Sequence, residues 1–119
     1  MSYDDYDVIV YKVLSYIYAC LKAGTYPSLD KAQEITRCND VYWLQVIQSM
    51  VNDGYLQGVK IPDYLGNDAK PIANTRSLGL TQKGAQYLDN NSTMAEVKTF
   101  LGKAFDKIID IAIKATMAI

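Results

Sequence analysis

Amide side chains recur along one face of a segment near the middle of this 119-residue chain. They are Gln45, Gln48 and Asn52, and spacings of three and four residues place them side by side on an α-helix. A glutamine or asparagine in the major groove can form two hydrogen bonds to one adenine. Tyr42 and Ser49 fall on the same face, where their hydroxyl groups could reach phosphates. These residues predict a helix that binds double-stranded DNA.

Positive charge for such an interface comes mainly from the segment after this helix. Lys60, Lys70 and Arg76 lie there with two aspartates, which gives residues 60–76 a local charge of +1 (3 − 2). The helix has no Lys or Arg, and the whole chain has 12 basic and 13 acidic residues, a net charge of −1. Because neutralising phosphates supplies most of the affinity for DNA, the alternative of a protein–protein interaction or assembly module without DNA binding stays open.

Catalytic and metal-binding chemistry has few candidates in this chain. There is no histidine, which removes the commonest general base and metal ligand. Cys20 and Cys38 match no metal-ligand spacing and are expected to be buried thiols. The acidic run of Asp4, Asp5 and Asp7 is expected to be a solvated helix start. We therefore expect no enzymatic activity, no cofactor, no metal and no small-molecule ligand.

The first helix is expected over about Asp5–Ala23, with Gly24 ending it. Its apolar face is predicted to consist of Tyr6, Val10, Val13, Leu14, Ile17, Cys20 and Leu21, opposite Lys12, Ser15, Ala19 and Lys22. Three further tyrosines, Tyr11, Tyr16 and Tyr18, flank the apolar face, so their hydroxyl groups are expected to reach water.

The other elements follow from helix caps and chain breakers. Ser28, Asn39 and Thr81 are the expected N-caps of the second, third and fourth helices. The third helix is expected over residues 40–53 with Gly54 as its C-cap, and its Trp43, Ile47 and Met50 are expected in one core with Leu14. Antiparallel strands over 55–61 and 76–80 flank a loop over 63–75, and the fourth helix stops at 90–91. This order predicts a mostly helical α+β fold, a winged helix-turn-helix domain over residues 1–91.

Residues 92–119 are expected to form one long C-terminal helix of the same domain, started by a capping box of Thr93 and Glu96. Its first apolar set is Val97, Leu101, Ala104, Ile108, Ile111 and Ala115, at alternating spacings of four and three, and Phe105, Ala112 and Ile119 widen it. A second set, Ile109, Ile113 and Met117, falls on the far side. We predict that this second set forms a homodimer interface. The alternative is that the first set packs on the first helix and the second belongs to a fraying tail.

The chain starts with an acidic segment where a signal peptide would be basic. No apolar run approaches the roughly 20 residues of a membrane span. We therefore expect a cytoplasmic protein with no membrane partner.

Several motifs resemble those of the YjcQ family, small proteins of bacteria and their prophages. They are Tyr11-Lys12-Val13-Leu14, Tyr18-Ala19-Cys20-Leu21-Lys22-Ala23-Gly24, Tyr42-Trp43, Asp53-Gly54-Tyr55-Leu56-Gln57-Gly58-Val59-Lys60, Leu80-Thr81-Gln82-Lys83-Gly84 and Tyr87-Leu88. They span roughly residues 6 to 116 in an order that matches the predicted elements. The resemblance implies a winged-helix fold and a phage or prophage setting, so phage assembly joins the non-DNA alternative. It carries over no catalytic or binding residues.

Overall fold

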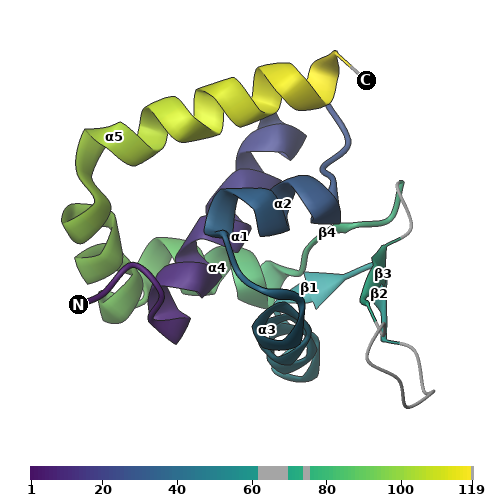
Figure 1. Ribbon diagram of the computed structural model, residues 1–119, viewed down its shortest axis with the longest axis horizontal. Coiled ribbons are helices and arrows are strands. Elements are labelled where there is room, and N and C mark those ends of the chain that lie inside the picture. The colour runs from purple at the N-terminus through teal and green to yellow at the C-terminus, as the bar shows by residue number, and fades with distance from the viewer. Residues whose placement is uncertain (62–69, 74–75, 119) are drawn as a thin grey trace.

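Helix α1 (Tyr6–Lys22) runs through the middle of the molecule and contacts all four other helices (Figure 1). The computed structural model describes residues 1–61, 70–73 and 76–118. Nine of the 17 residues of α1 are buried, and they lie around most of its circumference, as expected of a helix inside a core. The prediction of a single apolar face was therefore too narrow. Val8 and Ile9 are fully buried, whereas Leu21, predicted to be inside, is 43% exposed.

The hydroxyl group of Tyr16 was predicted to reach water, but Tyr16 is fully buried. Its Oη accepts a hydrogen bond from the Ser28 N–H at 3.1 Å and lies 2.8 Å from Thr116 Oγ1. Thr116 Oγ1 donates its own proton to the Ala112 carbonyl at 2.8 Å, so the Tyr16 hydroxyl must donate to Thr116. This network ties α1 to the start of the second helix and to the end of the last.

Helices α2 (Leu29–Thr36) and α3 (Asp40–Asn52) begin at the predicted caps. Ser28 Oγ accepts from the Lys31 N–H at 3.3 Å, and Asn39 Oδ1 accepts from the Tyr42 N–H at 2.8 Å. Gly54, at φ 80°, follows α3 as its predicted terminator.

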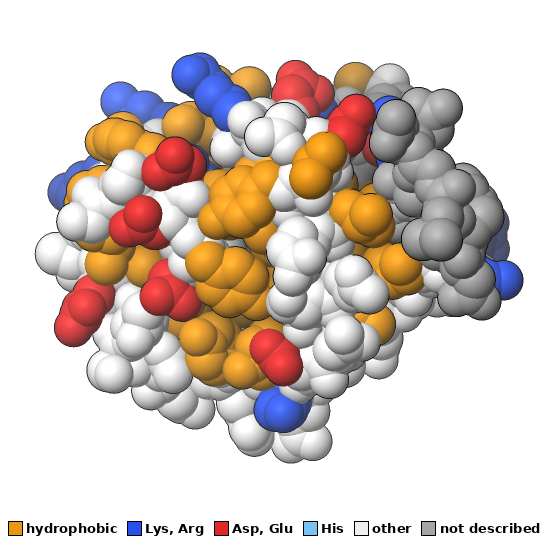
Figure 2. All heavy atoms as spheres, turned by 60° about the horizontal axis from the view of Figure 1, so that its bottom comes forward, with side chains coloured by type: hydrophobic (Ala, Val, Ile, Leu, Met, Phe, Trp, Pro, Cys, Tyr) orange, Lys and Arg blue, Asp and Glu red, His pale blue; other side chains and the backbone are white. Residues whose placement is uncertain are grey.

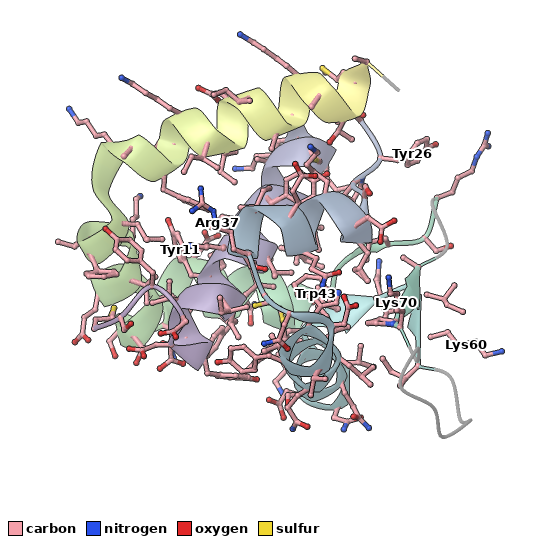
Figure 3. All side chains as sticks on the ribbon, in the orientation of Figure 1. Tyr11, Tyr26, Arg37, Trp43, Lys60 and Lys70 are labelled. Carbon is pink, nitrogen blue, oxygen red and sulfur yellow. The ribbon has the colours of Figure 1, made fainter. Side chains whose placement is uncertain are left out.

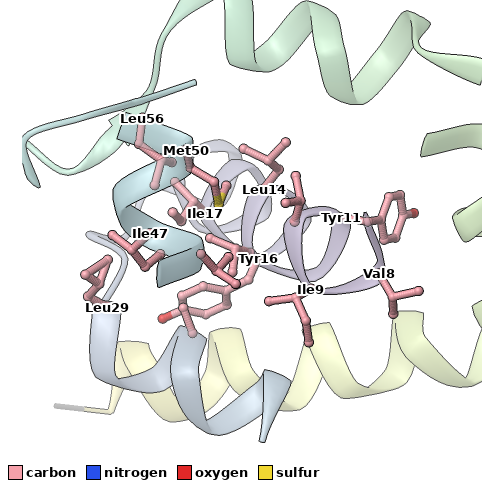
Figure 4. Close-up of a cluster of buried hydrophobic side chains, with 14 of the residues drawn as sticks. Val8, Ile9, Tyr11, Leu14, Tyr16, Ile17, Leu29, Ile47, Met50 and Leu56 are labelled. Carbon is pink, nitrogen blue, oxygen red and sulfur yellow. The ribbon is translucent and has the colours of Figure 1, made fainter. Parts of the chain in front are cut away.

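The inward face of α3 completes the centre of the core. Trp43, Ile47 and Met50 are buried with Leu14 in one cluster, as predicted. Figure 4 shows Leu14 of α1 together with Ile47 and Met50 of α3. Because α3 buries its large apolar side chains on one side only, its polar residues are left on the other.

The strands are shorter and more divided than predicted. β1 (Leu56–Gln57) pairs antiparallel with β4 (Gly79–Leu80), and β2 (Val59–Lys60) pairs antiparallel with β3 (Ile72–Ala73). The first predicted strand breaks at Gly58, which has a φ of 77°. A Cβ there would overlap the Ser77 backbone. The chain bends at this close approach, so β2 is the second half of the predicted 55–61 strand. Its partner β3 falls within the predicted 63–75 loop, most of which lies outside the described residues.

Helix α4 (Gln82–Asn90) begins at Thr81 and ends where predicted. Thr81 Oγ1 accepts from the Gly84 N–H at 3.0 Å and donates to the Gly54 carbonyl. A Cβ at Gly84 would overlap the Tyr55 carbonyl. The start of α4 is therefore held directly against the chain that leaves α3.

Helix α5 (Ser92–Met117) does not start with the predicted capping box of Thr93 and Glu96. Its N-cap is Asn91, whose Oδ1 accepts from the backbone N–H groups of Thr93 at 2.9 Å and Met94 at 3.2 Å. One carboxamide oxygen thus satisfies two of the free N–H groups at the helix start.

The prediction of one continuous C-terminal helix was wrong, because Gly102 has non-helical dihedral angles (φ 67°, ψ −165°). The chain turns sharply between the two parts of α5, and the second part crosses over α1 and α2 (Figure 1). The buried residues are Met94 and Val97 before the break, and Phe105, Ile109, Ala112 and Thr116 after it. The predicted stripe, continued past Gly102, instead consisted of Ala104, Ile108, Ile111 and Ala115, and only the residues that widened it, Phe105 and Ala112, are among those buried. The break shifts the buried stripe by one residue, which is about 100° around a helix.

Candidate nucleic-acid interface

The outward face of α3 carries the three predicted amide side chains. Gln45, Gln48 and Asn52 are exposed, and within the described part of the chain their side chains make no hydrogen bond. Val41, at the first turn of α3, is 81% exposed and lies on the same face. The structure therefore presents a row of amide groups with one branched apolar side chain at its start.

Tyr42 and Ser49 lie on the flank of α3 that faces the N-terminal segment, and both are half-buried. The Tyr42 hydroxyl donates to the Asp4 carbonyl at 3.0 Å. Ser49 lies close enough to the Tyr6 hydroxyl to lower its pKa, although burial raises that pKa more. Both groups proposed as phosphate contacts thus have partners within the protein, and neither shares the open position of the amide row.

The two strand pairs bring basic side chains to the edge of the molecule. Lys60 pairs across from Ile72, and both are exposed, Ile72 by 57%. Figure 3 shows Lys60 pointing away from the body of the protein and Lys70 beside the same strands. Arg76 is also exposed, and its guanidinium lies 5.9 Å from the centre of the Tyr26 ring. Arg76 therefore lies beside the α1–α2 loop.

Negative charge surrounds the opposite flank of α3. Asp4 and Asp5 lie close enough to Tyr42 to act on its ionisation, and Asp53 follows the helix directly. Figure 2 brings the lower end of the molecule forward and shows hydrophobic side chains gathered in the middle of this face, with several acidic side chains beside them. Of the two basic residues before α3, Lys31 is paired with Glu34 at 3.2 Å, whereas Arg37 is exposed. The two flanks of α3 therefore differ in charge.

The predicted dimer stripe is not one exposed surface. Ile109 is only 8% exposed and Ile113 packs against the core, whereas Met117 is 54% exposed. The large apolar residues that α5 does expose include Ile108 (47%) and Ile111 (68%), which the prediction had placed inside. The break at Gly102 explains the exchange, since it rotates the second part of the helix.

Two exposed apolar residues, one on α3 and one on β3, were given no role from the sequence. They are Val41 and Ile72. Val41 could have been noticed in the sequence, because it is an apolar residue on the polar face of α3. No local signal marked Ile72, which lay in a segment predicted to be a loop.

Among the described residues, no three Cys, Asp or Glu side chains come together in a way that could hold a metal ion. No helix in the described ranges is both long and apolar enough to cross a membrane. A groove of about 510 Å³ lies between α1, α4 and α5 and is lined by residues that include Tyr18, Lys22 and Asp106. It is remote from the amide row of α3.

Comparison with known proteins gives one match. The family model described as YjcQ protein matches residues 11–108, which is most of the chain. No curated protein and no solved structure matches.

Proposed function

This chain belongs to the YjcQ family, and we propose that it is a winged helix-turn-helix protein that binds double-stranded DNA in a sequence-specific manner. In this proposal α2 and α3 are the helix-turn-helix, and the two strand pairs are the wing. α3 enters the major groove and the wing contacts the phosphate backbone. The role is that of a cytoplasmic regulator of the phage or prophage type, which binds and does not catalyse.

The turn between α2 and α3 supports the helix-turn-helix assignment. Three residues separate the helices, and the first, Arg37, has the left-handed φ of 59°. The Gln33 carboxamide Nε2 donates to the Cys38 carbonyl at 3.1 Å and to the Asp40 carboxylate at 2.8 Å. One side chain of α2 thus fixes the start of α3. A short turn of this kind is typical of the motif.

The amide row of α3 is the single observation that carries the proposal. A side chain reads a base edge only if its own donors and acceptors are available, and those of Gln45, Gln48 and Asn52 have no partner in the described chain. Amides at such positions recognise adenine. The exposed methyl groups of Val41 suit the C5-methyl group of thymine. We therefore propose a preference for a site rich in A·T pairs.

Charge determines both the approach and the strength of binding. DNA is expected to approach from the wing side, because the opposite flank of α3 carries Asp4, Asp5 and Asp53. With Lys60, Lys70 and Arg76 as the phosphate contacts, two or three phosphates are neutralised. The logarithm of the binding constant should then fall with the logarithm of the salt concentration with a slope between about −1.8 and −2.7.

The test is a titration of the protein with duplexes of mixed sequence at low and moderate salt. Lys70→Ala and Arg76→Ala should weaken binding to all sequences and flatten the salt dependence. Gln45→Ala or Gln48→Ala should cost about 1–3 kcal/mol on the preferred site only.

Lys98→Ala and Gln86→Ala, on exposed positions of α5 and α4, are the matched controls. No binding at low salt, or equal effects of the variants and their controls, would contradict the proposal and favour a protein-interaction or phage-assembly role.

A second copy of the chain is the protein partner that we propose. This proposal rests on the exposed flank of α5, where Ala104, Ile108 and Ile111 lie on one side of the helix. Exposed apolar surface of this kind usually marks an interface, and two-fold dimers are the commonest result. A dimer would also place two α3 helices for a two-part DNA site.

A further inference from the structure

Three tyrosine rings from separate parts of the chain gather beside the C-terminal end of α3. The rings of Tyr55 and Tyr87 are stacked, with centroids 4.5 Å apart and planes inclined by 19°. Tyr6, at the start of α1, is 38% exposed and lies close to Ser49, Asp53 and Tyr55. We call Tyr6, Tyr55 and Tyr87, with the neighbouring carboxylates of Asp7 and Asp53, the tyrosine patch.

The backbone holds the central ring of the tyrosine patch in place. The Tyr55 N–H donates to the Met50 carbonyl at 2.9 Å, and the Tyr55 carbonyl accepts from the Thr81 N–H at 3.1 Å. Gly84 of α4 packs so closely on the Tyr55 carbonyl that no larger residue fits. Tyr87 is on the same helix, so the stacked pair is fixed as α4 docks. A surface that is already ordered loses little entropy when a partner binds.

The carboxylates of the tyrosine patch lack a cationic partner. Asp7 and Asp53 act on both Tyr6 and Tyr87, whose pKa values are raised first by burial and then by neighbouring charges. Within the described residues the single ion pair joins Lys31 to Glu34 of α2, so neither aspartate is neutralised by a contact of that kind.

One cation does lie on the tyrosine patch, but it contacts a ring and forms no ion pair. Lys83 Nζ is 5.5 Å from the centre of the Tyr55 ring, within the range of a cation–π interaction. Lys83 is exposed, so an incoming cation could replace it.

We propose that the tyrosine patch binds a basic segment of a partner protein. An arginine or lysine side chain would lie on the Tyr55–Tyr87 pair in place of Lys83, and its neighbours would pair with Asp7 and Asp53. The charge of the patch complements such a segment and repels nucleic acid. The surface is separate from the amide row of α3, so the proposal does not depend on DNA binding.

The experiment uses the full chain and a fluorescent peptide of six arginines, measured by anisotropy at low salt. The wild-type protein should bind this peptide, and the side-chain NMR signals of Tyr6, Tyr55 and Tyr87 should shift on titration. Tyr55→Leu should weaken binding about two- to five-fold, the range of an exposed cation–π interaction. Lys83→Met should tighten binding by a similar factor, because it removes the competing internal cation.

The controls separate the tyrosine patch from general charge attraction. Asp53→Asn should weaken binding, whereas Asp30→Asn, an equally exposed carboxylate on α2, should not. Lys98→Met should not reproduce the effect of Lys83→Met.

The proposal is overturned if the wild-type chain does not bind the peptide, if both aspartate variants weaken binding equally, or if the tyrosine signals do not move. It is also overturned if those signals shift with protein concentration alone, because the occupant would then be a second copy of the chain. The NMR titration needs no variant, so it stands if Tyr55→Leu fails to fold.

Discussion

Gly102 interrupts α5 with a backbone conformation that is open essentially to glycine alone (φ 67°, ψ −165°). We predict that Gly102→Ala destabilises the protein although the new methyl group meets no neighbour. An ideal Cβ at this position has no heavy atom within 4 Å, so the cost comes from the backbone. Holding a non-glycine residue in such a region costs about 1–3 kcal/mol.

The chain could avoid this strain by straightening α5, but straightening would cost more. Alanine is about 1 kcal/mol better than glycine inside a helix. A continuous helix would, however, run straight on past the turn at Gly102 (Figure 1) and carry the second part of α5, with Phe105 and Ile109, away from α1 and α2. Burying a large apolar side chain contributes about 1.5–3 kcal/mol, so these two together contribute about 3–6 kcal/mol. The bend should therefore persist, and the variant should carry the strain.

Urea unfolding followed by circular dichroism would measure the loss in free energy of unfolding, and a thermal melt would measure the fall in Tm. For a chain of this length, 1 kcal/mol corresponds to about 4 °C in Tm, so Tm should fall by about 4–12 °C. Lys103→Ala, next to the bend and exposed, should change stability by less than about 0.5 kcal/mol. D-alanine at position 102, for which this conformation is the mirror image of a favourable one, should retain most of the stability. An unchanged or higher Tm for Gly102→Ala would refute the reasoning.

Three further predictions concern the core and the exposed flank of α5. Tyr16→Phe removes the hydroxyl that serves Ser28 and Thr116, so it should cost about 1–3 kcal/mol in urea unfolding; a loss near zero would mean that water replaces the hydroxyl. Burial raises the pKa of Tyr16 above its ordinary value of 10.0. The stability that the neutral hydroxyl contributes is therefore present below about pH 10 and lost as pH rises through the folded pKa, and Tyr16→Phe should flatten this alkaline loss. Ile108→Glu with Ile111→Glu should give a folded monomer in sedimentation, whereas a wild-type chain already monomeric at high micromolar concentration would contradict the dimer.

Features that depend on a few adjacent residues could be predicted from the sequence. Ser28, Asn39 and Thr81 each cap a helix through a backbone N–H three residues later, and so short a loop forms whatever the rest of the chain does. The sorting of α3 into a buried and an exposed face was also predictable, because a single helical period of 3.6 residues orders all of its side chains. The amide row of the candidate site was found for this reason.

The partners of side chains outside these local patterns were decided by tertiary structure. Tyr42 and Ser49 share the exposed face in the sequence, but the N-terminal segment folds against that flank of α3 and provides partners for both. The tyrosine patch was not visible in the sequence either, since its rings come from α1, α4 and the residue that precedes β1.

The last helix shows most clearly where sequence reasoning ends. The sequence by itself determined that residues 92–117 are helical apart from the break at Gly102, and that two apolar stripes run along them. It could not determine which stripe is buried, because Gly102 is compatible both with a continuous helix at a small cost and with a sharp bend. The choice depends on the burial of Phe105 and Ile109 against α1, which is roughly 90 residues away along the chain. Burying these two side chains stabilises the fold by more than the helix propensity of one residue. That stabilisation exists only once the core has assembled.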